Sequence, residues 1–379
     1  PLLLVPFMYL PSGVLAYSFF MSVLAGILLP LITYLLGKKL SGERAALFAA
    51  GLIAFEPHAV FYSFLLQTEV PFMLFGLGGL LAAYMAYERS SYGIAALSGA
   101  LFGYAAFIRP GLFPIFIVIA LCTTGFLALS RDTRYRHTLA MLLVFVAFLM
   151  PWHLRNQAVT GSFALSGQGW RNVYTDYLAS IRSLDRGTPY HEEKENLKVE
   201  ALPRFGIPRA GVNDPANAAV LRNAALSEMW EHKMTVAKLE TMLLVTFFFN
   251  DGYYYEFRHL GYLADDSRGQ HISPTYEILN NGIAALPSIM SELSRQAWIP
   301  LWGRLFTLST FVLAIVGFFL MKSRMRYIFA AAIALFALTS TAIGLGLDAR
   351  LRVPIEPLLF ILASVALVWI IVRVRTLYG

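Results

Sequence analysis

The stretch from Asp348 to Pro357, DARLRVPIEP, separates the last two long apolar runs of the chain. It places two arginines and two carboxylates between segments that carry almost no other charge. A charge at the boundary of a membrane span is costly unless it is paired or solvated, so a functional role is the default expectation for such residues. The apolar runs on either side determine the fold class, and the charges between them point to the function.

The composition is that of an integral membrane protein. Of the 379 residues, 58% are hydrophobic and 14% are charged, and the mean hydropathy is +0.61, well above that of soluble domains. Because a bilayer core of about 30 Å requires about 20 apolar residues per helix, we predict an all-α, polytopic membrane protein. The roughly nine predicted spans are 13–36, 45–64, 70–87, 93–108, 112–129, 138–152, 301–321, 327–346 and 354–372. The segments 93–108 and 138–152 are short enough to be partly embedded helices instead.

Basic residues in short loops predict the orientation, because they accumulate on the cytoplasmic side. The loops 38–44 (KKLSGER), 131–136 (RDTRYR) and 322–326 (KSRMR) and the C-terminal tail fall on the same side when the spans alternate. The loop with Glu88 and Arg89 is neutral and gives no indication. We therefore expect these loops inside and the long polar stretch 153–300 outside.

The predicted organisation has three parts. Residues 1–152 form an N-terminal transmembrane bundle of about six spans, and residues 301–379 form a C-terminal bundle of about three. The stretch 153–300 is too long for a simple connection, so we interpret it as an extracytoplasmic, mostly helical domain. Within it, 221–249 has helical periodicity and an apolar end, which is typical of an interfacial helix or of the core of the outer domain.

Several classes of protein are disfavoured. The single Cys122 lies in a predicted span and excludes an intrachain disulfide. The chain has no GxxxxGK[ST] loop, HExxH, GxSxG or N-x-[ST] sequon, so nucleotide-driven transport by this chain alone is not expected. The net charge of +7 resides mainly in the inside loops, which reflects membrane orientation, and we expect no nucleic-acid partner.

Five charged residues stand at predicted outer ends of spans, where arginine should be rare. They are Glu69 in LLQTEVPF, Arg109 in AFIRPGLF, Arg155 in MPWHLRNQ, and Arg350 and Arg352 in the stretch DARLRVPIEP (348–357). A second carboxylate, Glu56, precedes Pro57 at a kink inside a span.

Each of these charges also has a structural interpretation. Arg109 could cap carbonyls before the Pro110-Gly111 turn, and Arg155 could flank an interfacial tryptophan. Asp348 and Glu356 could neutralise Arg350 and Arg352. Glu69 could complement the N-terminal dipole of its span.

Several guanidinium groups beside a hydrophobic bundle suit a lipid phosphate, because arginine binds phosphate oxygens in a bidentate manner. A nearby carboxylate could hold a metal, orient a sugar hydroxyl or act as a base. The residues assign no particular cofactor, and a divalent metal ion stays an open alternative.

Four motifs in order then carry a family resemblance. PHAVFYSFLLQTEVPF (57–72), IRP (108–110), PWHLRN (151–156) followed by TGSFALSGQGW, and RLRVPIEPLLFILAS (350–364) resemble the GT-C superfamily of integral-membrane glycosyltransferases. The closest likeness is to the bacterial group similar to dolichyl-phosphate-mannose-protein mannosyltransferases and related to lipid A aminoarabinose transferases. Each motif is weak alone, and the resemblance extends over essentially the whole chain.

The resemblance implies transfer of a sugar from a polyprenyl-phosphate donor to a lipid, glycan or protein acceptor. It places the protein in the bacterial inner membrane, among membrane lipids, with an active site on the extracytoplasmic face. Glu69 would be the catalytic acidic residue at the outer start of a span, and Arg350 and Arg352 would face the donor phosphate, with Arg109 and Arg155 as further phosphate-binding positions.

One departure concerns the N-terminus. Members of this superfamily carry their main catalytic acid in a first outer loop, and this chain begins PLLLVPFMYL, which resembles the region just after that loop. We therefore expect the chain to be N-terminally truncated, with that acid upstream of Pro1.

Two rival functions differ in what they require. A flippase for lipid-linked oligosaccharides, or a polymer ligase, would also use outer arginines, although a flippase should have inverted repeats. A non-catalytic scaffold subunit would not require Glu69 to approach the arginines.

Overall fold

The computed structural model describes residues 5–10, 12–65, 67–250 and 298–378 and the single positions 261, 284 and 287. Across these residues the regular elements are helices, without a strand, which confirms the all-α polytopic fold. Seven of the described helices are long and apolar enough to cross a membrane, and the bent pair α2–α3 makes an eighth. The shorter apolar helix α5 accounts for the ninth predicted segment.

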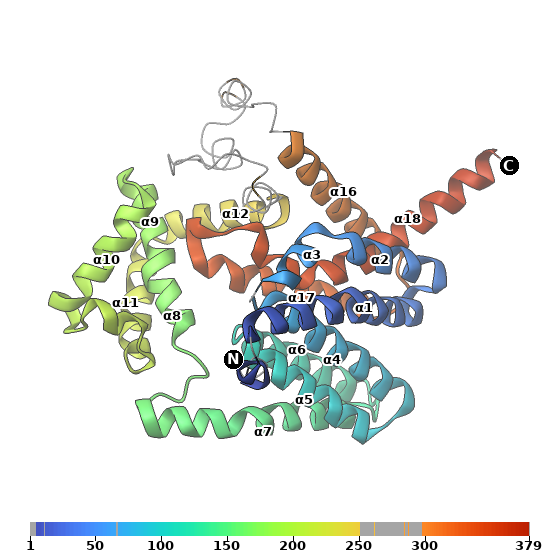
Figure 1. The fold of residues 1–379 in the computed structure, drawn as a ribbon, viewed down its shortest axis with the longest axis horizontal. Helices are drawn as coiled ribbons and strands as arrows, with labels where there is room; N and C mark the ends of the chain where they lie inside the picture. Colours follow the sequence, from blue (N-terminus) through green and yellow to red (C-terminus); the bar gives the residue numbers. More distant parts are fainter. Residues whose placement is uncertain are drawn as a thin grey trace.

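The N-terminal bundle is formed by a short 3-10 turn and seven helices that pack on one another (Figure 1). The helices are α1 (Gly13–Ser41), α2 (Glu43–Phe55), α3 (Pro57–Phe64), α4 (Glu69–Arg89), α5 (Tyr92–Ile108), α6 (Leu112–Leu129) and α7 (Tyr135–Thr160), after the turn η1 (Val5–Tyr9). The predicted span 138–152 is thus part of a longer helix, α7, which is long enough to cross the membrane.

The break between α2 and α3 has a local cause. Pro57 disfavours a helical conformation for the preceding residue, and Glu56 is extended there, with φ −68° and ψ 119°. Its carboxylate accepts a hydrogen bond from the backbone N–H of Ala59 at 2.6 Å and so caps α3. The chain bends by 48° at this point, and a carboxylate is thereby fixed inside the bundle.

The loops predicted to be inside lie together at one end of the bundle, to the right in Figure 1. The contacts that join them are the ion pair Lys39–Glu88 (2.5 Å), the stacking of Arg134 on Tyr87 (3.9 Å to the ring centroid) and the electrostatic interaction of Asp132 with Arg324. Hydrogen bonds from Arg134 lower the pKa of Asp132, and the charge of Arg324 lowers it further.

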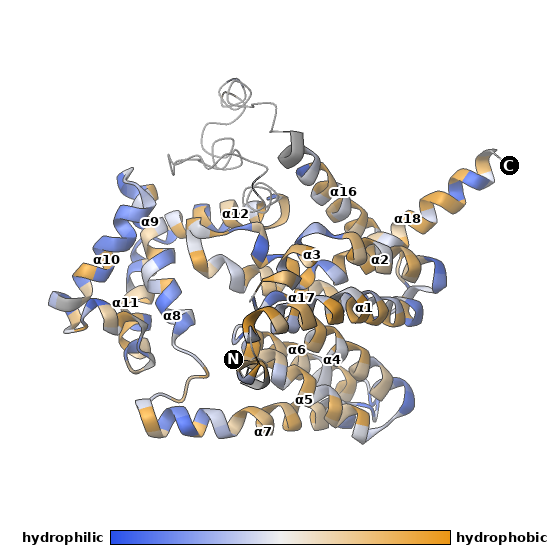
Figure 2. Cartoon of the chain, viewed as in Figure 1, coloured by the Kyte–Doolittle hydropathy of each residue, from blue (hydrophilic) through white to orange (hydrophobic). Residues whose placement is uncertain are grey.

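A more polar helical region follows α7 and lies at the opposite end of the molecule (Figure 2). Its elements are α8 (Gln168–Asn172), the π-helix η2 (Val173–Tyr177), α9 (Leu178–Arg186), α10 (Tyr190–Phe205), η3 (Arg209–Asn213), η4 (Pro215–Asn217), α11 (Ala218–Glu231) and α12 (Lys233–Phe249). The periodic segment 221–249 is therefore two helices, because His232 (φ −103°, ψ 31°) leaves the helical conformation between them. α12 buries Leu239, Leu243 and Phe247 and packs against α9, α16 and η7.

The C-terminal part places its last helix at the centre of the structure. Its elements are α16 (Trp298–Leu320), α17 (Met325–Ser340), η7 (Thr341–Gly346), η8 (Ala349–Leu351), η9 (Val353–Ile355) and α18 (Glu356–Tyr378). Residues 352–364 are all buried, and α18 packs against α16 and α2. Gly317 permits the close approach of α16, since a Cβ there would lie 1.8 Å from the carbonyl oxygen of Leu362. The stretch 348–357 is therefore interior from Arg352 onward, whereas Asp348 is exposed and Arg350 is half-buried.

Candidate functional site

Glu69 is the centre of a cluster of charges from three separate parts of the chain. It begins α4 and is completely buried. Its Oε1 accepts a hydrogen bond from Nε of Arg350 at 2.7 Å, across 281 positions of sequence, and lies 3.6 Å from Nη2 of Arg109. Arg350 also donates to the side-chain oxygen of Gln67. The structure thus brings Glu69, Arg109 and Arg350 together at the end of the bundle opposite the basic loops.

The position of Arg109 follows from the turn that ends α5. Its backbone is extended (φ −131°, ψ 98°) and its N–H bonds the carbonyl of Ala105, so α5 stops at Ile108. The guanidinium lies 5.9 Å from the ring centre of Phe72 and 5.8 Å from that of Phe336. Burial lowers the pKa of Arg109, and the negative charge of Glu69 opposes that shift. The carboxylate therefore helps to keep a buried cation charged.

Two buried atoms of this cluster have no hydrogen-bond partner in the described part of the chain. They are Oε2 of Glu69, an acceptor, and Nη1 of Arg109, a donor. A buried polar atom left unsatisfied costs about 1–3 kcal/mol, so such atoms usually mark a place for water or a ligand. The side chain of Arg350 is 34% exposed, which opens the cluster to the surface. A polar ligand that both accepts and donates would complete it.

Arg352 does not contact Glu69, so the expectation that both arginines of the stretch 348–357 meet this carboxylate is wrong for Arg352. Its Nε lies 3.2 Å from Glu356 Oε1, and its Nη1 donates to the carbonyl oxygens of Phe247 (3.1 Å) and Asn250. These carbonyls end α12, so Arg352 caps that helix. Arg350 lies within η8, whereas Arg352 stands between η8 and η9, and the side chains of the two arginines reach different partners.

Arg155 also lies apart from Glu69. It is exposed near the end of α7, with its guanidinium 4.8 Å from the ring centre of Trp152, and its Nη1 donates to the side chain of Asn156 at 3.2 Å. The cause is the length of α7, which continues to Thr160 and carries this residue away from the bundle (Figure 1). These contacts are typical of an exposed arginine that flanks the end of a membrane span beside a tryptophan.

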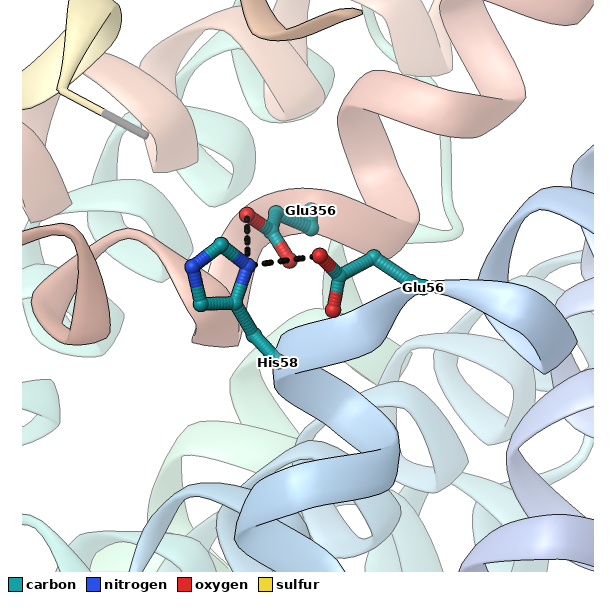
Figure 3. A group of neighbouring side chains, drawn as sticks. All are labelled: Glu56, His58 and Glu356. Atoms are coloured by element: carbon teal, nitrogen blue, oxygen red, sulfur yellow. Dashed lines mark hydrogen bonds and ion pairs between the residues drawn. The ribbon is translucent and has the colours of Figure 1, made fainter. Parts of the chain in front are cut away.

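A second buried cluster, Glu56, His58 and Glu356, lies on α3 and α18 (Figure 3). Nδ1 of His58 lies 2.6 Å from Glu56 Oε1 and 3.9 Å from Glu356 Oε1. Glu56 and Glu356 were both considered from the sequence, whereas His58 was missed. The signal was present, because an ionisable residue directly after the kink at Glu56-Pro57 stands inside an apolar segment.

These three residues could hold a divalent cation. One ligand atom from each lies within 4.8 Å of the others, and an imidazole with two carboxylates is a donor set that zinc and manganese accept. Oε2 of Glu356 is buried without a hydrogen-bond partner among the described residues. A cavity of about 10 Å³ adjoins Glu56, Glu356 and Arg352, which is room for about one water or ion.

The same cluster can also be neutral without a metal. Protonated His58 and Arg352 would balance the charges of Glu56 and Glu356, and buried charges are commonly paired in this way. The cavity is far too small for a sugar in either case. The cluster is therefore a buried group of charges without room for a sugar-sized ligand.

The apolar helices are those of an integral-membrane protein. One carboxylate and two guanidiniums form a polar site at one end of its helical bundle. Residues 4–153 match the family described as dolichyl-phosphate-mannose-protein mannosyltransferase. This match supports a mannosyltransferase-like membrane glycosyltransferase of the GT-C type. The matched range contains Glu56, His58, Glu69 and Arg109, and the residues from Arg155 onward lie beyond it. No curated protein and no solved structure matched the chain.

Proposed function

We propose that this protein transfers a sugar from a polyprenyl-phosphate donor to a lipid, glycan or protein acceptor on the extracytoplasmic face of the bacterial inner membrane. The observation that carries the proposal is the convergence of Glu69, Arg109 and Arg350, with one buried acceptor atom and one buried donor atom that find no hydrogen-bond partner among the described residues. A scaffold subunit would have no need of this convergence. Arg352 and Arg155 are left out of the proposed site because their contacts lie elsewhere.

The arginines suit the charge that develops during such a transfer. The acceptor hydroxyl forms a bond to the anomeric carbon while the bond from that carbon to the phosphate oxygen breaks. The donor phosphodiester, with one negative charge, leaves as a polyprenyl monophosphate with a second charge, and the hydroxyl proton passes to a base. Fixed guanidiniums stabilise charge that appears in the transition state. Arg350 and Arg109 would hold the phosphate.

Glu69 has two features that suit it to this reaction. Its Oε1 holds the guanidinium of Arg350 in place, and its Oε2 is left to accept a hydrogen bond from a sugar or acceptor hydroxyl. A carboxylate placed in this way can orient a hydroxyl or remove its proton. We assign Glu69 to contact with the reacting groups on the basis of this geometry.

The test of this function is sugar transfer from a panel of radiolabelled polyprenyl-phosphate sugars, measured with the purified protein in nanodiscs. The Arg350→Ala variant should raise the KM for the donor by about 10- to 150-fold, since a charge-assisted hydrogen bond contributes about 1.5–3 kcal/mol. Arg350→Lys should recover only part of the loss, because a lysine cannot bind bidentately.

Arg89→Ala is the matched control, since Arg89 is exposed at the other end of α4. An Arg350→Ala enzyme with an unchanged donor KM would contradict the assignment of this residue. Absence of transfer from every donor of the panel would contradict the proposed function.

The proposed orientation places the basic loops in the cytoplasm and the polar region after α7 outside. It predicts that Ser130→Cys and Ser227→Cys, each introduced into a Cys122→Ala background, react with a membrane-impermeant maleimide from opposite sides. Ser130 ends α6 among the basic loops, Ser227 lies on α11, and both are exposed. Intact cells should label only Ser227→Cys, and inverted vesicles only Ser130→Cys. Labelling of both from the same side would refute the orientation.

A further inference from the structure

The polar region after α7 contains a cavity that is distinct from the Glu69 cluster. Its volume is about 540 Å³, within the range of ligand pockets of about 300–1,000 Å³. Four of the residues that line it are basic, and they come from three elements: Arg171 of α8, Lys194 and Lys198 of α10, and Arg209 at the start of η3. Thr175 adds a hydroxyl group to the wall.

Among the described residues, two carboxylates, Asp176 and Glu195, form ion pairs with these four cations. Asp176 pairs with Lys194 and lies 3.9 Å from Arg171. Glu195 pairs with Lys198 at 2.7 Å and also with Arg209. Each of these two carboxylates is thus shared by two cations, and the described lining of the cavity contains four basic side chains and no acidic one.

Basic groups gathered on one concave wall favour the binding of an anion. Lys194 and Lys198 are four positions apart on α10 and therefore share a helix face. Like charges at this spacing repel each other, and a concave wall of one sign concentrates the field and attracts counter-ions. The side chains of Lys194, Lys198 and Arg171 are each about one quarter to one third exposed, so they are accessible to a ligand in the cavity.

A second observation connects this cavity to the Glu69 cluster. Thr175 and Asp176 belong to the π-helix η2, and π-helical turns are frequent at functional sites. η2 packs on η7 so closely that a Cβ on Gly344 would lie 2.6 Å from the carbonyl oxygen of Asp176. Gly344 has φ 62°, a conformation that glycine adopts without strain. η7 leads directly through Asp348 to Arg350.

We propose that this cavity, lined by Arg171, Lys194, Lys198 and Arg209, binds a phosphate-bearing ligand. Two guanidiniums and two ammonium groups are the donors that recognise phosphate oxygens, and the volume accommodates a phosphorylated sugar or a lipid headgroup. The site does not depend on the sugar-transfer reaction, and its ligand is bound without turnover.

The experiment measures binding by the full chain in nanodiscs, with inorganic pyrophosphate and a hexose 1-phosphate as soluble probes. In phosphatidylcholine discs, the wild type should bind a soluble probe, and affinity should fall as salt is raised. The double variant Lys198→Gln/Arg209→Gln should weaken this binding by at least about tenfold, because charge-assisted hydrogen bonds are lost. The charge-preserving variant Lys198→Arg/Arg209→Lys should retain it, and Arg222→Gln, exposed on α11, is the control.

A second arm distinguishes a lipid headgroup from a free phosphate. Discs that contain phosphatidylglycerol, compared with phosphatidylcholine discs, should raise the thermal midpoint of the wild type and not that of the double variant if the ligand is a lipid. A response in either arm that requires Lys198 and Arg209 supports the proposal and identifies the source of the phosphate. If both arms give the same result for the wild type and the double variant, the cavity is not a phosphate site.

Discussion

The Glu69→Gln variant should transfer sugar about 10² to 10⁴ times more slowly than the wild type, the range associated with loss of a positioned acid or base. Glutamine keeps an oxygen that can accept the hydrogen bond from Arg350, so the local geometry should persist. It removes the negative charge that balances Arg109 and Arg350, and it removes the basicity of the second oxygen. The expected loss is therefore in kcat, with a smaller change in the KM for the donor.

Two controls separate chemistry from folding. Glu88→Gln changes a carboxylate at the other end of the same helix, where it pairs with Lys39 near the surface, and should leave transfer unchanged. Glu69→Gln should lower the thermal midpoint, because Arg109 loses its buried counter-charge, so kcat is compared at a temperature well below the midpoint of the variant. A Glu69→Gln enzyme with wild-type kcat would exclude a role for this residue in the reaction.

The Arg352→Ala variant should lose about 3–5 kcal/mol of stability, since removing one partner of a buried ion pair leaves an uncompensated charge. Arg352 is 2% exposed, and its loss would leave the two carboxylates Glu356 and Glu56 with His58 as their remaining partner in this cluster. It would also release the carbonyls of Phe247 and Asn250 at the end of α12. Thermal denaturation in detergent micelles measures the effect, with Arg350→Ala as the partly exposed comparison.

The double variant Arg352→Leu/Glu356→Leu should be more stable than Arg352→Ala, because no carboxylate of the pair then stays buried. The same samples decide between the two states of the Glu56–His58–Glu356 cluster. A resident divalent cation would make the wild type sensitive to EDTA and would give a stoichiometric metal content. Equal stability of Arg352→Ala and the wild type would show that the buried pair contributes nothing.

The sequence predicted the fold better than the site, for physical reasons. Membrane spans follow from long runs of one property, and the apolar segments correspond to helices even where, as in α7, the helix continues past the predicted end. The same argument located Glu69, Arg109 and Arg350 at one end of the bundle, because boundary charges are rare.

The side-chain partners could not be derived from that argument. Whether Arg350 or Arg352 meets Glu69 depends on the rotation of short 3-10 turns, which hydropathy does not encode. The sequence marks His58 as an ionisable residue inside an apolar segment, but its partner Glu356 is evident only when the kink at Pro57 faces α18 across the bundle. The break at His232 is likewise a local conformational event within a segment whose periodicity continues on both sides.

The central position of α18 has a consequence for the order of assembly during synthesis. Glu56 and Glu69 are synthesised well before Arg350 and Arg352, which lie near them in the folded protein and precede α18. Until the two arginines are made, the carboxylates of the N-terminal bundle lack these counter-charges. The buried charge pairs of the N-terminal bundle are therefore completed only when the segment that leads into α18 packs against it.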